Sequence, residues 1–320
     1  MKKLYGFFLI FIMFASGCSR NDGKSGIIRL AYLQGDLHQL ACWVALDKNY
    51  FADEGLDVEV AGIFKAGPEE MSAFSAGSLD IGYAGQAPAT TAAANKTADI
   101  VVLAQANYEG SAVVVNRDSK ISKFAGLAGK TIAIPGHSTV QEFLLRKAII
   151  KYGLENKEIS IIVLKPPEMI NALSAKQIDA FIAWEPYPAK AVTSGIGKIL
   201  ITSSEIWKGH QCCVLVADLK FYKNNPEKIK GIVRAHIKAT DFISKNIDDA
   251  VRIAIKYSGM DETTVRTAMN NIRYGYIPAI EGEIEYVVFL NKLGYINVEN
   301  PRAFTERFIN SKILNDLLKK

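Results

Sequence analysis

The sequence predicts an α/β protein of two similar lobes, and three observations support this fold class. Segments with strand and helix periodicity alternate along residues 27–203, as they do in doubly wound, mainly parallel sheets. The motif SAGSLDIGYAGQAP at 75–88 returns in related form as SAKQIDAFIAWEPY at 174–187. Two apolar segments, 110–116 and 211–217, flank the second half of the repeat. If both segments cross between the lobes, they form a two-strand hinge.

The N-terminus has the composition of a secretory signal. Two lysines precede an apolar run that is too short to span a bilayer and that ends in small residues. The letters ASGC, ending at Cys18, resemble the bacterial lipobox, whose cysteine is acylated after cleavage. The alternative is an ordinary signal with an incidental cysteine. We expect cleavage after 1–17, a lipid such as palmitate on Cys18, a polar tether over 18–27, and an exported protein anchored to the outer face of the cell membrane.

In the first half of the repeat, glycine and proline mark where helices begin and end. Pro68 lies near the start of one helical segment, and Gly55 and Gly77 follow two of them. The expected strands are 27–33, 56–63, 79–85 and 99–106, and the expected helices are 40–55, 67–77 and 87–96.

The second half restarts the same order. Its expected strands are 130–136, 158–164, 178–184 and 197–203, and its expected helices are 139–153, 166–177 and 186–195. The rest of the chain is mostly helical, with apolar residues at a 3.6-residue period in 224–246, 261–272 and 305–320. We expect these helices to complete the first lobe. Lobe I then comprises 28–110 and 214–320, and lobe II comprises 111–213.

Charge and motifs exclude several classes of function. The net charge of +5 is small and scattered, so we expect no nucleic-acid partner. The sequence contains no P-loop, HExxH, GxSxG or CxxC pattern, so we expect no catalytic residues, no enzyme activity and no cofactor. Cys42, Cys212 and Cys213 are expected to be buried apolar side chains. Because neighbours in a strand point to opposite faces, only His210 would share a face with Cys212, and we expect no metal site.

Four loops are expected at the carboxyl ends of the strands, where α/β sheets bind ligands: 34–38, 85–88, 136–139 and 184–187. Each precedes a helix, so each offers unpaired backbone N–H groups and a positive dipole end. None contains lysine or arginine, which disfavours a multiply charged ligand. Two facing lobes with such loops predict a clamp for a small anion or for a zwitterion.

The chain also resembles a known family in five ordered motifs: ACWVALDKNYFADEGLDVEV, SAFSAGSLDIGYAGQAPA, GSAVVVNRDSKISKFAGLAGKTIAIPGHST, ALSAKQIDAFIAWEPYPAKA and NNPEKIKGIVRAHIKAT. Together they resemble the substrate-binding proteins of ABC importers in the nitrate, sulfonate and taurine group. The resemblance implies a two-lobed periplasmic-binding-protein fold of type II, a monomer, and an ABC permease with its ATPase as partners. Carried over by position, the ligand-facing residues are Gln34, His38, Gly85, Gln86, Ser111, Ser138, Thr139, Trp184 and Glu185.

For the ligand we expect a small sulfonate, taurine or an alkanesulfonate. An amine on the ligand would pair with Glu185 and lie against the ring of Trp184. If Glu185 instead caps a helix or pairs with Lys190, a plain sulfonate, nitrate or bicarbonate fits equally well. Thiamine-pyrimidine binders share this fold, and some of their relatives are synthases. The segment HQCCVLV lacks the longer cysteine run of the synthases, and the export signal argues against a biosynthetic enzyme.

Overall fold

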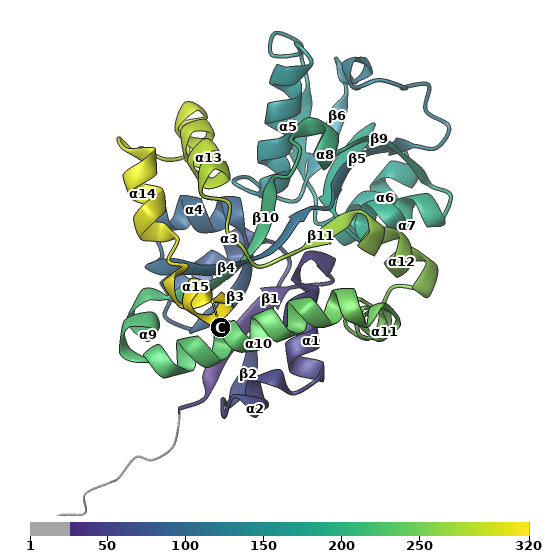
Figure 1. Ribbon diagram of the computed structural model, residues 1–320. Coiled ribbons are helices and arrows are strands. Elements are labelled where there is room, and N and C mark those ends of the chain that lie inside the picture. The colour runs from purple at the N-terminus through teal and green to yellow at the C-terminus, as the bar shows by residue number, and fades with distance from the viewer. Residues whose placement is uncertain (1–25, 320) are drawn as a thin grey trace, which may run out of the picture.

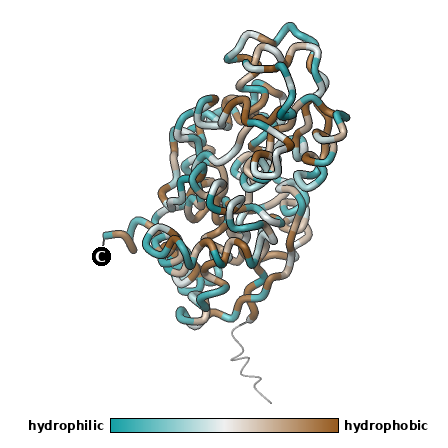
Figure 2. The backbone as a smooth tube through the Cα atoms, turned by 90° about the vertical axis from the view of Figure 1, so that its right-hand side faces the viewer, coloured by the Kyte–Doolittle hydropathy of each residue, from teal (hydrophilic) through white to brown (hydrophobic). Residues whose placement is uncertain are grey.

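The computed structural model describes residues 26–319, which form two lobes, each built around one mixed β-sheet (Figure 1). The expected signal, Cys18 and most of the tether lie outside the described residues. Within 26–319, no helix has both the length and the apolar character needed to cross a bilayer. Figure 2 shows an elongated molecule in which apolar and polar stretches alternate along the backbone of both lobes.

The sheet of the first lobe has six strands in the order β11-β4-β10-β3-β1-β2. The strands are β1 (Ile28–Leu33), β2 (Val58–Phe64), β3 (Ile81–Gly85), β4 (Ile100–Glu109), β10 (Gln211–Asp218) and β11 (Ile272–Tyr274). The sheet of the second lobe has five strands in the order β7-β6-β8-β5-β9. These are β5 (Ser111–Asn116), β6 (Thr131–Ile134), β7 (Ser160–Val163), β8 (Ala180–Trp184) and β9 (Gly197–Thr202).

The two sheets repeat one topology, which confirms the internal repeat. In each, the first strand of the half pairs in parallel with the second and third strands. A strand that has just crossed from the other lobe then lies antiparallel between the third and fourth strands: β10 in the first sheet and β5 in the second. In each sheet the four strands of the repeat run in one direction, as expected, and the crossing strand runs against them, so the sheets are mixed. A chain that enters from the opposite lobe runs against the direction of the strands it joins.

The two crossings lie at Gly110, between β4 and β5, and at 203–210, between β9 and β10. The first is a single residue, because β4 ends at Glu109 and β5 begins at Ser111. All of β10 belongs to the first sheet, so this strand begins before the expected lobe boundary at 213/214.

Short helices connect the strands of the repeat, and most lie where the sequence predicts them. They are α1 (Leu40–Asp47), α2 (Tyr50–Asp53), α3 (Gly67–Ser75), α4 (Gln86–Ala94), α5 (Val140–Lys151), α6 (Pro166–Ser174), α7 (Tyr187–Thr193) and α8 (Ser203–Ile206), with 3-10 turns at Leu37–Gln39 and Phe124–Leu127. The expected helix 40–55 is two helices, because Asn49 between them adopts a left-handed conformation with φ 57°.

The C-terminal part is helical, as expected, with two differences. Its helices are α9 (Leu219–Asn224), α10 (Pro226–Lys245), α11 (Ile247–Ser258), α12 (Glu262–Asn270), α13 (Ile280–Lys292), α14 (Pro301–Phe308) and α15 (Lys312–Leu318). The expected helix 305–320 is broken at Ile309, which forms a bridge to Val102 of β4. Helix α10 packs on α1 of the first lobe, but α12 packs on α7 of the second, so this part of the chain contacts both lobes (Figure 1).

Candidate functional site

The candidate site is the cleft between the lobes, at the carboxyl ends of β1, β3 and β8. Four of the predicted ligand-facing residues line it: His38, Gly85, Thr139 and Trp184. The lining is completed by Leu33, Asp36, Gly67, Pro88, Val140, Gln141, Cys212 and Cys213. The lobes are closed, and the free space between these side chains is ≈ 10 Å³, about what one water molecule needs. A solute larger than water therefore needs the lobes to separate before it can enter.

Two helices begin at this cleft, one from each lobe. Helix α4 begins directly after Gly85, which has the extended backbone of an N-cap residue. Helix α5 is capped by Thr139, whose hydroxyl accepts a hydrogen bond from the backbone N–H of Glu142 at 3.2 Å. In the first turn of each helix, backbone N–H groups lack an acceptor within the helix. The dipoles of both helices also favour a negative charge in the cleft.

Trp184 adds an unpaired donor to the cleft. It ends β8, and its side chain is buried. Among residues 26–319, its indole N–H makes no hydrogen bond. Buried polar groups are nearly always paired, so this N–H stands out as a donor that is free to bind a group in the cleft. Nearby, Gln141 donates through Nε2 to the Ser111 hydroxyl at 3.0 Å, which ties α5 to the crossing strand β5.

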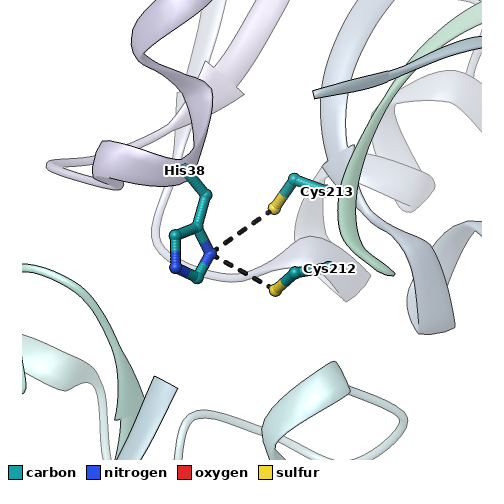
Figure 3. Close-up of side chains that lie close together, drawn as sticks. All are labelled: His38, Cys212 and Cys213. Carbon is teal, nitrogen blue, oxygen red and sulfur yellow. Dashed lines mark hydrogen bonds between the residues drawn. The ribbon is translucent and has the colours of Figure 1, made fainter. Parts of the chain in front are cut away.

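The floor of the cleft, on the side of the first lobe, holds a compact group of acidic, imidazole and thiol side chains. Figure 3 shows the imidazole of His38 and the thiols of Cys212 and Cys213. His38 Nδ1 lies 3.3 Å from the sulfur of Cys212 and 4.0 Å from that of Cys213. The carboxylate of Asp36 lies 3.7 Å from the Cys213 sulfur and 3.6 Å from His38 Nδ1. We call these four residues the thiol–imidazole cluster. All four are buried.

The positions of Cys212 and Cys213 contradict the expectation that they point to opposite faces. The pairing of β10 with β4 shifts register between Gln211 and Cys213, so Cys212 is the extra residue of a β-bulge. Asn107 stabilises the bulge by accepting a hydrogen bond from the Cys213 N–H at 2.9 Å. With the alternation broken, both sulfurs approach the same nitrogen, and that nitrogen belongs to His38 rather than His210.

Gly110, the residue of the first crossing, positions the ring of His38. Its carbonyl lies 2.7 Å from His38 Nε2, so this nitrogen carries the proton and donates it to the carbonyl. A side chain at Gly110 would collide with the ring, and its φ of +85° is one that glycine adopts without strain. The arrangement leaves Nδ1 facing the two thiols.

Burial and mutual charge shift the pKa values of the thiol–imidazole cluster. Burial raises the pKa of Asp36 to about 7. Burial opposes charge on the ring of His38, but the Cys212 sulfur and the Asp36 carboxylate outweigh it and raise the pKa of His38 to about 9. Burial likewise opposes charge on Cys212, yet contacts with Cys213 and His38 hold its pKa well below the usual range. Both shifts favour charge at the contact between Cys212 and His38, negative on the sulfur and positive on the ring.

The other five predicted residues lie outside the cleft lining. The side chain of Gln34 is exposed, and Ser138 borders a neighbouring surface groove with His137. Gln86 is buried beside Thr90, 3.5 Å from its hydroxyl. Ser111 and Glu185 line a separate pocket with the second crossing.

Glu185 is held by groups of the protein itself. One oxygen accepts from the backbone N–H of Ala189 at 3.0 Å and so caps α7. The other accepts from Asn271 Nδ2 at 2.7 Å. Burial raises the pKa of Glu185 to about 7. Lys190, the lysine considered as its partner, pairs with Asp261 instead. The helix-capping alternative fits these contacts, and the pairing of Glu185 with a ligand amine does not.

Asp36, Gln141 and the two cysteines line the cleft without having been predicted from the sequence. Asp36 lies in the loop 34–38, between the predicted residues Gln34 and His38. Its position in the sequence therefore indicates that it faces the cleft. Gln141 follows the capping residue of α5 within the first helical turn. Nothing in the sequence indicates that both cysteines face the cleft. Side chains of a regular strand alternate between faces, and the bulge in β10 arises only from its pairing with β4.

Two α/β lobes that repeat one topology, two crossings and a cleft between facing helix N-termini define a periplasmic-binding-protein fold. Residues 28–256 match the model of the NMT1-like family, and the chain belongs to that family.

Relatives with named ligands occur among the similar proteins. The chain is 30% identical over 199 residues to the taurine-binding periplasmic protein of Escherichia coli, covering 61% of each chain. It is 26% identical over 278 residues to a putative aliphatic sulfonates-binding protein of Bacillus subtilis, covering 85% of this chain and 83% of that one. The periplasmic nitrate-binding protein NrtA of Synechocystis PCC 6803 superposes with a TM-score of 0.82 at 16% identity, covering 92% and 88%. That superposition supports the fold.

Proposed function

We propose that this protein is the exported solute-binding component of an ABC importer and that it captures a small, singly charged anion, preferably a sulfonate, between its lobes. The observation that carries the proposal is the unpaired N–H of Trp184, which lies in a cleft where helices from both lobes begin. The relatives that bind taurine and aliphatic sulfonates support the choice of anion.

The polar lining favours one negative charge over several. Apart from the thiol–imidazole cluster, its groups are neutral donors such as Thr139, Gln141 and the Trp184 indole, and no lysine or arginine is among the cleft-lining residues of the described chain. Backbone N–H groups and neutral donors are suited to a sulfonate or a nitrate, and phosphate dianions usually call for arginine or lysine as well. The amine of taurine has no assigned partner in this proposal, because Glu185 is engaged elsewhere.

The test is calorimetric titration of the purified protein with an alkanesulfonate, taurine, nitrate, bicarbonate and a thiamine pyrimidine. We expect measurable binding of a sulfonate. Trp184→Phe removes one hydrogen bond to a charged group, worth about 1.5–3 kcal/mol, and should weaken that binding roughly 10- to 100-fold.

Trp43→Phe is the matched control. Trp43 is also fully buried with an unpaired indole N–H among the described residues, but it belongs to the core of the first lobe. The control should keep the affinity of the parent protein. Equal losses of affinity in the Trp184 and Trp43 variants would show that Trp184 does not bind the ligand. If only nitrate, bicarbonate or the pyrimidine gives a heat of binding, that compound replaces the sulfonate as the proposed ligand.

A further inference from the structure

The thiol–imidazole cluster brings together the donor atoms of a metal site. The side-chain donors of His38, Cys212 and Cys213 all lie within 4.8 Å of one another, and all three residues are buried (Figure 3). Asp36 brings a fourth donor, with carboxylate oxygens 3.6 Å from His38 Nδ1 and 3.7 Å from the Cys213 sulfur. In a tetrahedral zinc site with metal–ligand distances of ~2.0–2.3 Å, neighbouring donors are separated by roughly 3.3–3.8 Å. The observed separations of 3.3 to 4.0 Å are close to this geometry.

The groups around the cluster orient these donors as a metal site requires. His38 donates its Nε2–H to the Gly110 carbonyl at 2.7 Å, so Nδ1 is the nitrogen that faces the thiols and can ligate an ion once it gives up its proton. Histidines that ligate metals almost always donate their other ring N–H in this way. Asp36 is itself fixed, because it accepts hydrogen bonds from the His38 backbone N–H at 3.0 Å and from Gln39 Nε2 at 3.2 Å.

We propose that the thiol–imidazole cluster binds one soft or borderline transition-metal ion, of which zinc is the type, through His38 Nδ1, the Cys212 and Cys213 sulfurs and an Asp36 carboxylate oxygen. Two thiolates and an imidazole select zinc or copper(I) over magnesium and calcium. Binding releases to solvent the protons that the cluster holds on Nδ1 and on sulfur, and it leaves the oxidation states unchanged.

All four ligands belong to the first lobe, since Asp36 and His38 follow β1 and the cysteines lie in β10 of the same sheet. The metal site therefore forms whether the lobes are open or closed, and it does not depend on the solute. Failure of sulfonate binding and failure of metal binding are separate results. An ion on the cleft floor would also present a positive charge to a solute bound above it.

The test uses the purified full chain, reduced with a phosphine that does not chelate metals, and titrated with cobalt(II) as a spectroscopic substitute and with zinc. We expect one ion per chain, thiolate-to-cobalt charge-transfer bands, and visible bands of tetrahedral cobalt. Cys212→Ser and Cys213→Ser should each remove the charge-transfer intensity of one thiolate. Removal of a residue that only hydrogen-bonds to a metal ligand weakens metal binding roughly 10- to 100-fold. Each cysteine substitution removes a ligand itself, so each should weaken zinc binding by more than that.

Cys42→Ser is the matched control, because Cys42 is a buried free cysteine of the same lobe outside the cluster. It should keep the spectrum and the affinity of the parent. Circular dichroism establishes that each variant is folded. His38→Gln provides a second route to the same answer if a serine variant fails to fold. A folded, reduced parent without thiolate–cobalt bands, or zinc binding equal in all variants, overturns the proposal.

Discussion

Glu283 shows what burial does to a single residue of this fold. It lies on α13 and is fully buried. Its carboxylate accepts hydrogen bonds from the Thr90 hydroxyl at 2.6 Å and from Gln211 Nε2 at 3.0 Å. Both partners are neutral, and burial outweighs their hydrogen bonds and raises the pKa of Glu283 to about 8. The folded protein therefore holds this carboxyl protonated at a pH where the unfolded chain has already lost the proton.

This raised pKa predicts a pH-dependent stability. The stabilising contribution of Glu283 is complete below its unfolded pKa near 4.5 and is lost as pH rises through about 8, because the folded state binds more protons in that window. Glu283→Gln should flatten the fall in unfolding free energy across this range and stabilise the protein at its upper end. Each pKa unit corresponds to about 1.4 kcal/mol, so the gain amounts to a few kcal/mol. Urea unfolding at both ends of the window measures it.

Glu281→Gln is the control for this measurement. Glu281 lies on the same helix, but it is exposed and pairs with Arg302 at the surface. Its replacement should leave the pH dependence of the parent unchanged. A Glu283→Gln protein whose stability falls with pH as steeply as the parent's would show that another group is responsible.

Among the elements, α13 contacts both lobes. It packs on α4 of the first lobe. On its other side, Phe289 contacts Phe143 of α5 edge to face, with ring centroids 4.7 Å apart, and Glu285 pairs with Lys147. Beyond its end, Tyr295 is tied to the first lobe by Asn95 and donates its hydroxyl to Glu142 of α5 at 2.8 Å. The helix and its following loop thus span the cleft.

The hydrogen bond from Tyr295 to Glu142 should favour closure. Because one partner is charged and the pair is partly exposed, its loss costs about 1 kcal/mol. Tyr295→Phe should therefore shift the lobes toward the open state and weaken solute binding about fivefold. Small-angle scattering should give this variant a larger radius of gyration than the parent without solute, and saturating solute should reduce it. Tyr152→Phe, a surface tyrosine of the second lobe, should match the parent. Unchanged scattering together with unchanged affinity would show that the bond does not hold the lobes.

At the scale of the whole molecule, the proposed anchor determines where the protein works. The first described strand begins at Ile28, ten residues after Cys18 in the sequence. We propose that Cys18 carries lipid and that 18–27 tethers the lobes to the outer face of the membrane, beside the permease and its ATPase.

Cys18→Ala should abolish this anchoring. Without the acylated cysteine, the protein should remain unprocessed or be released, because an acyl anchor is the link that the lipobox supplies. Fractionation of cells into membrane and soluble parts, with labelled palmitate as a tracer, measures both outcomes. Cys42→Ser, which keeps the lipobox, serves as the control. Parent protein that fractionates as soluble without detergent, and without label, would contradict the anchor.

The sequence by itself determined the alternation of strands and helices, the internal repeat, the loops at the cleft and the family resemblance. These depend on local periodicity and on turn residues, which a linear chain displays directly. Of the residues that it predicts to face the ligand, His38, Gly85, Thr139 and Trp184 line the cleft, because residues at the carboxyl ends of strands face the cleft in this architecture.

Only the tertiary structure decided which of the remaining loop side chains turn inward and what the cysteines do. Glu185 follows Trp184 in sequence, yet it is drawn away from the cleft by Ala189 and by the distant Asn271. Cys212 meets His38 because β10 is bulged where it pairs with β4, and the direction of a strand side chain depends on that register. Register is a property of two paired strands, so a sequence that is read along one strand at a time does not contain it.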